Sequence, residues 1–334
     1  MNLLRKSICF ALLTGMLPLL AGCSRHSKKE HYYLIATSTK HAYWQSAKAG
    51  FEKAAAEYGV TAEVLGPEGF DPQAELTEFR NAVSRKPAGI LVSVANEDLF
   101  RTEINSAVAA GVPVITIDSD APTSHRLYFI GTNNLQAGRL GGARLAAQLN
   151  GKANVVFFTI AGQPNLEERL KGYRDVLAGS PEIKIADVFD MRGDSGVAMD
   201  KAREYLARTG PEKIDAMVCL ESTSGKGVAE ALKREGASRR VVVAMDVDPG
   251  TLRLVADGTI DSTISQKPYT MAYLGLKGLD NIFHYPVKAA ENYGLDPYTP
   301  FPAFVDTGVS LVDTSNVDAI MKVQQQNGVS TTGP

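Results

Sequence analysis

The stretch Pro113-Val-Ile-Thr-Ile-Asp-Ser-Asp-Ala-Pro122 decides the fold. Its β-branched apolar run, Val114 to Ile117, is typical of a strand that is buried on both faces of a parallel sheet. Asp118, Ser119 and Asp120 follow directly. Ligands of open α/β sheets bind beyond the carboxyl ends of the strands, so these side chains are candidate ligand acceptors. The alternative is a solvated turn, because Asp, Ser and Pro are also common turn residues.

The same pattern continues in both directions along the chain. From Tyr32 onward, short apolar runs alternate with longer amphipathic stretches, which predicts parallel sheets with helices on both faces. Expected strands are 33–37, 60–65, 89–94, 112–117, 127–130, 154–159, 184–189, 216–220, 241–244 and 261–265. Expected helices are 46–58, 72–85, 97–110, 134–149, 166–177, 196–207, 224–235, 249–256 and 268–283, before an extended segment at 304–312.

Length and composition agree with a two-lobed globular protein. The chain has 334 residues, more than one compact core usually holds, and the alternation restarts after residue 130. Hydrophobic residues make up 44% of the chain, charged residues 22%, and the net charge is −2. There is no basic excess, so we expect no nucleic-acid partner.

Residues 1–23 are interpreted as an export signal. Arg5 and Lys6 precede the apolar stretch Ile8 to Leu20, which is too short to span a bilayer comfortably. It ends in Leu20-Ala21-Gly22-Cys23, which resembles the lipobox of bacterial lipoproteins, where the Cys is lipidated. We therefore expect Cys23 to anchor the protein to a membrane surface. The alternative is a cleaved signal from which Cys23 is lost, and the sequence does not distinguish an outer membrane from a single-membrane cell surface.

Two further segments are expected to lie outside the lobes. Residues 24–31 are polar and basic and are interpreted as a flexible tether, and residues 324–334 are interpreted as a frayed tail. Cys219 remains as the only cysteine beyond the signal and its lipobox, so no intrachain disulfide is expected.

Polar and aromatic side chains gather in loops that follow the expected strands. They are Ser38, Tyr43, Trp44, Asp118, Ser119, Asn133, Asn134, Asn165, Arg169, Glu221, Asp246 and Gln266. Carboxylates, amides and a guanidinium exchange hydrogen bonds with hydroxyl groups, and an aromatic face covers the apolar patches of a sugar ring. The set suits a neutral polyol. No HExxH, cysteine pair or EF-hand loop occurs, so neither a metal nor a cofactor is expected.

Each candidate also has a structural interpretation. Tyr43 and Trp44 would pack as a staple against the following helix, and Arg169 would pair with a neighbouring glutamate on its own helix. Asp246 or Asp248 would cap the helix that begins after them, a role we expect Asp248 to fill.

Two other motifs are interpreted as structural features and not as catalytic or nucleotide-binding sites. The glycines at 138, 141 and 142 indicate close helix packing, because no glycine-rich turn precedes them in nucleotide-binding order. Gly193-Asp-Ser-Gly196 is similar to a serine-protease nucleophile motif, but no His lies in a context that would complete a triad.

Taken together, the chain resembles the periplasmic sugar-binding proteins of ribose-binding type, the receptors of ABC importers, over residues 32–312. The order and spacing of six motifs carry the resemblance: Thr37-Ser-Thr-Lys-His-Ala-Tyr-Trp44, Gly111-Val-Pro-Val-Ile-Thr-Ile-Asp-Ser-Asp120, Ile130-Gly-Thr-Asn-Asn134, Glu168-Arg169 before Gly172-Tyr173, Val243-Ala-Met-Asp246, and Ser265-Gln266.

The resemblance implies the periplasmic binding protein type 1 fold, an α/β fold with two doubly wound parallel-sheet lobes. Three crossings would join the lobes, near Asn133, Gln266 and Phe304. The N-terminal lobe would then contain residues 32–132 and 267–304, and the C-terminal lobe residues 133–266 and 305–323.

The resemblance also implies roles for individual residues. Tyr43 and Trp44 would stack on a sugar ring, Asp118 and Asp246 would accept hydrogen bonds, Arg169 would donate them, and Asn134 and Gln266 would lie near the hinge. A further pocket residue would be Phe189 or Met191. Two positions depart from the ribose binders: Ser119 stands where an Arg is usual, and Glu221 replaces an amide. These changes favour a ligand other than ribose, such as an amino sugar or a larger aldose or polyol.

We therefore expect a monomeric, lipid-anchored extracytoplasmic receptor that binds a sugar or polyol and delivers it to an ABC permease. One alternative is a sensor that engages a kinase or chemoreceptor. Another is an exported glycoside-processing enzyme that uses Asp118 and Asp246. A transcription repressor of related fold is excluded by the export signal and by the lack of an N-terminal DNA-binding helix pair.

Overall fold

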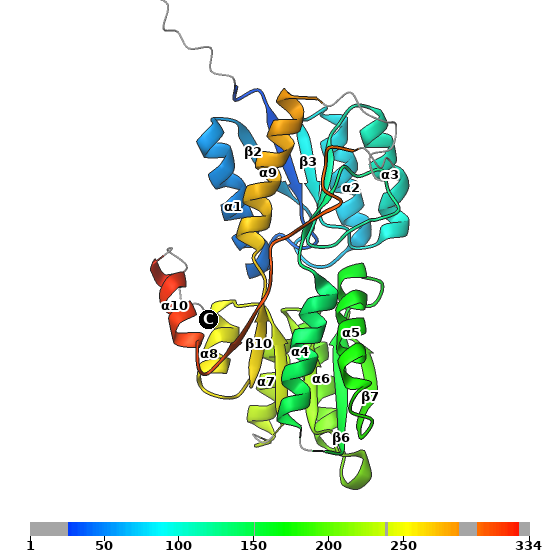
Figure 1. The fold of residues 1–334 in the computed structure, drawn as a ribbon, viewed down its shortest axis with the longest axis vertical. Helices are drawn as coiled ribbons and strands as arrows, with labels where there is room; N and C mark the ends of the chain where they lie inside the picture. The colour runs from blue at the N-terminus through cyan, green and yellow to red at the C-terminus, as the bar shows by residue number, and fades with distance from the viewer. Residues whose placement is uncertain (1–25, 150, 238–239, 287–298, 327–334) are drawn as a thin grey trace, which may run out of the picture.

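The computed structural model describes residues 26–149, 151–237, 240–286 and 299–326, which form two α/β lobes (Figure 1). The segment predicted to be an export signal, with Cys23, lies outside the described residues. The strands are β1 (His31–Ile35), β2 (Thr61–Leu65), β3 (Gly89–Val92), β4 (Val114–Ile117), β5 (Phe129–Gly131), β6 (Ala153–Thr159), β7 (Ile183–Asp190), β8 (Ala216–Cys219), β9 (Val241–Met245), β10 (Ser262–Ser265), β11 (Phe304–Asp306) and β12 (Ser310–Asp313).

Helices alternate with these strands, as the sequence predicts. They are α1 (Ala42–Tyr58), α2 (Pro72–Ser84), α3 (Glu97–Ala109), α4 (Asn134–Gln148), α5 (Pro164–Leu177), α6 (Ser195–Leu206), α7 (Ser224–Arg234), α8 (Pro249–Ala256), α9 (Pro268–His284) and α10 (Val317–Gln326), with a short 3₁₀ turn at Gly210–Glu212.

The two sheets share one topology. The N-terminal lobe has the strand order β2-β1-β3-β4-β5-β11, and the C-terminal lobe has the order β7-β6-β8-β9-β10-β12. The pairs are parallel except β10 with β12, which is antiparallel. The two-lobed, doubly wound fold predicted from the alternation is confirmed.

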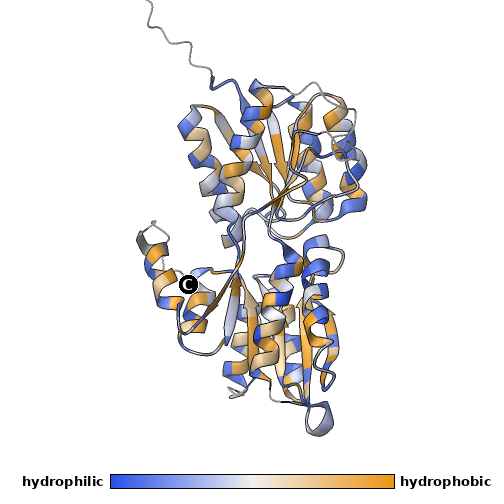
Figure 2. Ribbon diagram, in the orientation of Figure 1, coloured by the Kyte–Doolittle hydropathy of each residue, from blue (hydrophilic) through white to orange (hydrophobic). Residues whose placement is uncertain are grey.

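Burial explains the strand sequences. Every residue of β3 and β4 is buried, because helices cover both faces of the sheet and a continuous apolar run is then favoured. Figure 2 shows the hydrophobic residues concentrated in the strands and the hydrophilic ones along the outer sides of the helices.

Helix ends follow local capping rules. Asp71 accepts hydrogen bonds from the backbone N–H groups of Gln73 and Ala74, both at 3.0 Å, and so starts α2 as expected. Asp248 likewise caps α8 through Gly250 and Thr251, at 3.0 and 3.3 Å. At its C-terminal end α1 stops at Gly59, whose φ of 70° lies in the left-handed region.

Three segments cross between the lobes (Figure 1). The first joins β5 to α4, the second joins β10 to α9, and the third joins β11 to β12. The first and third lie side by side, because Thr307 donates its N–H to the Gly131 carbonyl at 2.9 Å and Asn133 donates its N–H to Asp306 at 3.2 Å. The third crossing therefore falls after Asp306, two residues beyond the expected position at Phe304.

Other boundaries also differ from the expectations. Helix α1 begins at Ala42 and not at residue 46, and α10 occupies 317–326, so residues 324–326 are helical and not part of a tail. Residues 26–31 do not form a tether: His26 packs on Tyr58 with ring centroids 4.8 Å apart, and β1 begins at His31. Within the part of the chain that is described, no helix has both the length and the apolar character needed to cross a bilayer.

Candidate ligand-binding site

A pocket lies between the lobes, at the carboxyl ends of strands from both sheets. It encloses about 710 Å³ of empty space, including the part that is open to solvent. The residues that line it are Thr37, Ser38, His41, Tyr43, Trp44, Gly69, Phe70, Asp118, Ile160, Gln163, Asn165, Leu166, Arg169, Gly193, Glu221, Ser222, Thr223, Asp246 and Gln266. Nine of the predicted site residues are in this set: Ser38, Tyr43, Trp44, Asp118, Asn165, Arg169, Glu221, Asp246 and Gln266.

Asp118 is held by groups from both lobes. The Tyr43 hydroxyl donates to its Oδ1 at 2.6 Å, and Ser93 donates to Oδ2 at 3.4 Å. Asn165, from the C-terminal lobe, also donates to Oδ2 at 3.4 Å. Burial raises the pKa of this carboxyl above 3.8, against the opposing effects of the Tyr43 hydrogen bond and the Arg169 charge. The carboxylate is thus a buried acceptor with a fixed orientation.

Asp246 is the corresponding acceptor of the C-terminal lobe and is tied to the hinge. Gln266 donates to its Oδ1 at 3.0 Å, and Thr132 donates to the Gln266 amide oxygen at 2.7 Å. Burial raises the pKa of Asp246 to about 7, and the nearby Asp118 charge acts in the same direction. Arg169 and the Gln266 hydrogen bond oppose that rise. The first two crossings therefore meet directly behind this carboxyl group.

Arg169 reaches the pocket from α5 and is 2% exposed. Its guanidinium donates to the Leu220 carbonyl and, at 2.6 Å, to the side-chain oxygen of Asn134. Its Nε–H is buried and has no hydrogen-bond partner within the described part of the chain. Leu220 and Asn134 use two of the five N–H donors of the guanidinium, and the Gln266 amide oxygen lies 3.5 Å from Nη2.

Close packing of α4 against α5 sets the position of Arg169. A Cβ atom at Gly138 would lie 1.9 Å from the Arg169 carbonyl oxygen, and one at Gly141 would lie 2.0 Å from the Tyr173 hydroxyl. Only glycine allows this approach. The packing role that the sequence indicates for these glycines is confirmed.

The aromatic lining differs in part from the expectation. Tyr43 and Trp44 lie in the first turn of α1, and both are largely buried, at 9% and 4% exposure. The Trp44 indole donates to Thr37 at 3.0 Å, so both side chains have fixed hydrogen bonds as well as a face on the pocket. Phe70 supplies a third ring, whereas neither Phe189 nor Met191 lines the pocket.

The lobes touch across the pocket. Nε2 of His41, in the N-terminal lobe, lies 3.4 Å from the Ser222 hydroxyl and 3.3 Å from the Thr223 hydroxyl. Nδ1 of the same ring accepts the Tyr43 N–H at 3.3 Å, which assigns the proton to Nε2. Burial lowers the pKa of His41 below 6.5, so the ring is a neutral donor to the opposite lobe at neutral pH.

Three predicted residues differ from the expected role of an open ligand-binding group. Ser119 is 1% exposed and is not among the lining residues. Asn134 lies behind Arg169 as its hydrogen-bond acceptor. Glu221 lines the pocket, but its carboxylate caps α7 by accepting the N–H groups of Thr223 and Ser224 at 2.5 and 2.8 Å. Of the two departures from the ribose binders, Glu221 is thus engaged in local structure, whereas the Ser119 hydroxyl is buried without a hydrogen-bond partner among the described residues.

Sequence reasoning missed His41, Phe70 and Gln163. His41 and Gln163 follow the first strand of their respective lobes, so the strand-end rule that found Tyr43 and Asn165 also applies to them. Phe70 follows β2, and no local pattern distinguishes it from an ordinary loop residue.

Comparison with known proteins gives a family match that covers most of the chain. A family model described as a periplasmic binding protein domain matches residues 32–283. The ribose import binding protein of Bacillus subtilis is 23% identical over 292 residues, which cover 84% of this chain and 94% of that protein.

Two solved structures of sugar-binding proteins are also similar to this chain. A sugar-binding protein of a sugar ABC transporter from Bacillus halodurans is 34% identical, with a TM-score of 0.74 over 87% of this chain and 99% of that one. An ABC-transporter solute-binding protein from Burkholderia graminis, in complex with D-arabinose, is 26% identical, with a TM-score of 0.78 over 86% and 96% of the two chains. These three proteins are named as binding proteins of transport systems and not as enzymes.

Proposed function

The chain belongs to the periplasmic binding protein family, and we propose that it is the sugar-binding receptor of an ABC importer. One observation carries the proposal: two buried carboxyl groups, Asp118 and Asp246, face one pocket from opposite lobes, with Arg169 beside them. A ligand that bonds to both carboxyl groups needs both lobes in place, which couples binding to lobe closure.

The polar groups of the pocket select the ligand class. Asp118, Asp246 and Glu221 outnumber the single guanidinium of Arg169, so an anionic ligand would be repelled. Carboxyl groups and the guanidinium of Arg169 match the hydroxyl groups of a neutral sugar, which both donate and accept.

The names of the relatives point to a small sugar or polyol as the ligand class. Ser119 and Glu221 carry no argument for an unusual ligand, because one is outside the pocket lining and the other caps a helix. The relatives include proteins named for ribose, xylose, arabinose and allose. We propose an aldopentose or aldohexose.

Delivery and location are further parts of the proposal. The lipobox at Leu20 to Cys23 supports a lipid anchor on the outer side of a membrane. A receptor held there would present its sugar-loaded, closed form to a permease in the same membrane.

A thermal-unfolding screen tests the function. The full-length protein in detergent is heated with a panel of pentoses, hexoses, amino sugars and polyols, and each sugar is recovered and checked for turnover. Ligand at a hundredfold excess over its dissociation constant stabilises the folded state by about 2.7 kcal/mol. That corresponds to a rise of several degrees. We expect such a rise with a small aldose and no product. Absence of a shift with every sugar would contradict sugar binding, and product formation would contradict a receptor role.

A further inference from the structure

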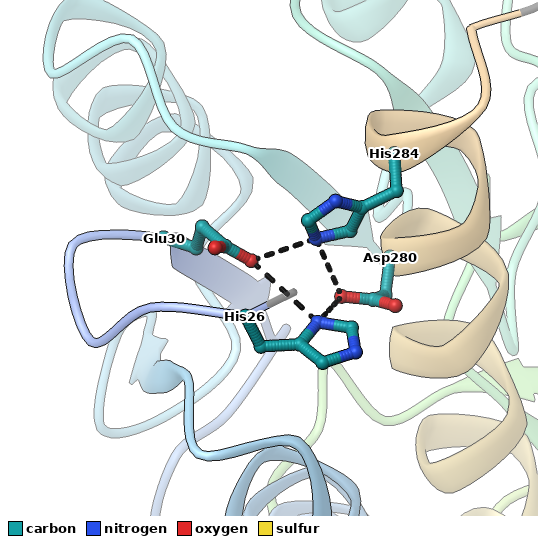
Figure 3. A group of neighbouring side chains, drawn as sticks. All are labelled: His26, Glu30, Asp280 and His284. Atoms are coloured by element: carbon teal, nitrogen blue, oxygen red, sulfur yellow. Dashed lines mark hydrogen bonds and ion pairs between the residues drawn. The ribbon is translucent and has the colours of Figure 1, made fainter. Parts of the chain in front are cut away.

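Four potential metal ligands meet on the N-terminal lobe, in a cluster separate from the sugar pocket: His26, Glu30, Asp280 and His284. Figure 3 shows their side chains pointing toward one common centre, two from the segment before β1 and two from the last turns of α9. One ligand atom of each residue lies within 4.8 Å of all the others. None of the four lines the pocket between the lobes.

Four of the distances between the ligand atoms are close to those around a four-coordinate metal. His284 Nε2 lies 2.9 Å from Glu30 Oε2 and 3.6 Å from Asp280 Oδ1. His26 Nδ1 lies 3.2 Å from Asp280 Oδ1 and 3.8 Å from Glu30 Oε2. Ligands at about 2.0 to 2.2 Å from a tetrahedral zinc ion lie roughly 3.3 to 3.6 Å apart. Two of these four separations are shorter than that range, one lies at its upper limit and one is longer, and the other two of the six distances are at most 4.8 Å, so side-chain movements would complete a tetrahedron.

Neighbouring groups already orient both carboxylates. Ser27 donates its backbone N–H to Glu30 Oε1 at 2.6 Å, which leaves Oε2 to face the two imidazoles. The Tyr32 hydroxyl donates to Asp280 Oδ1 at 3.2 Å, so the proposed ligand atom is held from behind. Metal-binding carboxylates and imidazoles are commonly fixed by such outer hydrogen bonds.

The ligands come from two backbone segments, and each segment is held in place by its own contacts. Asp280 and His284 are four residues apart on α9 and so share one face of the helix. The segment that carries His26 and Glu30 is tied to β2, because Thr61 donates its N–H to the Glu30 carbonyl at 3.0 Å and its hydroxyl to the Lys28 carbonyl at 2.8 Å. Two anchored pairs of ligands thus face each other.

Burial and charge also suit a divalent cation. The four side chains are 7% to 21% exposed, enough for an ion to enter and too little for full hydration of the carboxylates. Two carboxylates with two neutral imidazoles carry two negative charges, which one divalent ion neutralises. Imidazole and carboxylate together suit zinc better than magnesium or calcium, which prefer oxygen ligands alone.

We propose that His26, Glu30, Asp280 and His284 bind one zinc ion. The ion would fasten the segment before β1 to the end of α9. Zinc binding and sugar binding involve different residues, so either can be tested without the other.

Titration with the metal alone tests the proposal. Tag-free full-length protein in detergent is stripped with a chelator, dialysed, and titrated with zinc chloride in a calorimeter. We expect one zinc ion per chain, a rise in melting temperature on zinc addition, and a tetrahedral visible spectrum when cobalt(II) replaces zinc. An absence of binding, or an octahedral cobalt spectrum, would overturn the proposal.

Variants locate the ion. Loss of outer-sphere partners alone commonly lowers metal affinity by about 10- to 100-fold, so His284→Asn and His26→Asn should each lower it at least that much. Glu30→Gln keeps the side-chain shape and should lower zinc affinity to a similar extent. This variant keeps the proposal testable if the His variants do not fold. His31→Asn, an exposed neighbour outside the cluster, is the matched control and should bind as the wild type does. Wild-type zinc affinity in the cluster variants would place the ion elsewhere and overturn the proposal. Sugar affinity of all four variants should be unchanged.

Discussion

Asp118 and Asp246 occupy the same position in the two lobes. Asp118 follows β4 directly and Asp246 follows β9 directly, the fourth strand of each sheet in chain order. Each has a left-handed backbone, with φ of 65° and 70°, and each donates its N–H to the neighbouring fifth strand, at Ile130 and Ile264. A left-handed conformation is uncommon for a residue other than glycine. The repeated topology thus supplies two equivalent carboxyl groups to one pocket.

Loss of either carboxyl group should weaken sugar binding. A hydrogen bond to a charged group contributes about 1.5 to 3 kcal/mol. Asp246→Asn should therefore raise the dissociation constant by roughly ten- to a few hundredfold. Calorimetric titration with the sugar found in the screen measures the change. Asp200→Asn, at an exposed position of α6, is the control and should bind normally. Equal affinities in the two variants would exclude Asp246 from the binding site.

Sugar affinity should depend on pH through Asp246. Its pKa of about 7 means that the carboxyl group is half protonated at neutral pH and becomes a full acceptor as the pH rises. Binding of a hydroxyl donor should thus tighten between pH 6 and 8, by at most about tenfold per pH unit below the pKa. Titrations across this range should show the rise in the wild type and a flatter profile in Asp246→Asn. An affinity that falls with pH would mean that the protonated form binds.

The buried Glu75 should make stability depend on pH. Its side chain is 0% exposed in α2, neither carboxyl oxygen has a hydrogen-bond partner among the described residues, and burial raises its pKa well above 4.5. The folded state then holds a proton that the unfolded state releases, so its stabilising effect is complete below about pH 4.5 and is lost as the pH rises through the folded-state pKa.

Glu75→Gln keeps the group neutral at every pH. It should exceed the wild type in unfolding free energy at pH 7 by about 1 to 3 kcal/mol and match it near pH 4. Urea unfolding at the two pH values measures the difference. Glu78→Gln, on the same helix, should behave as the wild type does at both. A Glu75→Gln protein with no advantage at pH 7 would show that the buried carboxyl group is not destabilising.

Gly138→Ala should disturb both the fold and the site. The added methyl group would lie 1.9 Å from the Arg169 carbonyl oxygen, so α4 and α5 must separate. Overpacking of this kind costs about 1 to 3 kcal/mol, and displacement of Arg169 should weaken sugar binding as well. Gly179→Ala, where the nearest atom would be at 3.4 Å, is the matched control. Chemical denaturation and sugar titration of both variants measure the two effects, and a stable Gly138→Ala protein would contradict the packing argument.

The sequence predicted the two-lobed fold because each strand and helix carries its own local signal. Buried strands appear as apolar runs, and helices start at recognisable caps such as Asp71 and Asp248. The third crossing was misplaced because residues 304–312 look like one extended segment. They contain two strands in different sheets, separated at Gly308, whose φ is 80°. Helix α10 was missed because its polar, glutamine-rich end has the composition of a tail.

The site was predicted in part because strand ends are visible in a sequence and side-chain directions are not. Asp118 and Asp246 were found by position alone. Ser119, the next residue after Asp118, is buried away from the pocket lining, a consequence of the left-handed turn at Asp118. Phe70 is a loop residue of the N-terminal lobe, and it lines the pocket because the two lobes face each other there. The metal-ligand cluster joins two pairs, His26 with Glu30 and Asp280 with His284, that are far apart in the sequence, so neither four-residue spacing alone indicates a site of four ligands.

The single tryptophan offers the most direct test of the central claim that a sugar binds between the lobes. Trp44 is the only Trp in the chain, and it lines the pocket. Titration of the full-length protein with the sugar from the screen should change its emission saturably, with one site per chain, and Asp246→Asn should shift the midpoint to higher concentration. No saturable change with any sugar, or an identical midpoint in the variant, would contradict a sugar site between Asp118 and Asp246.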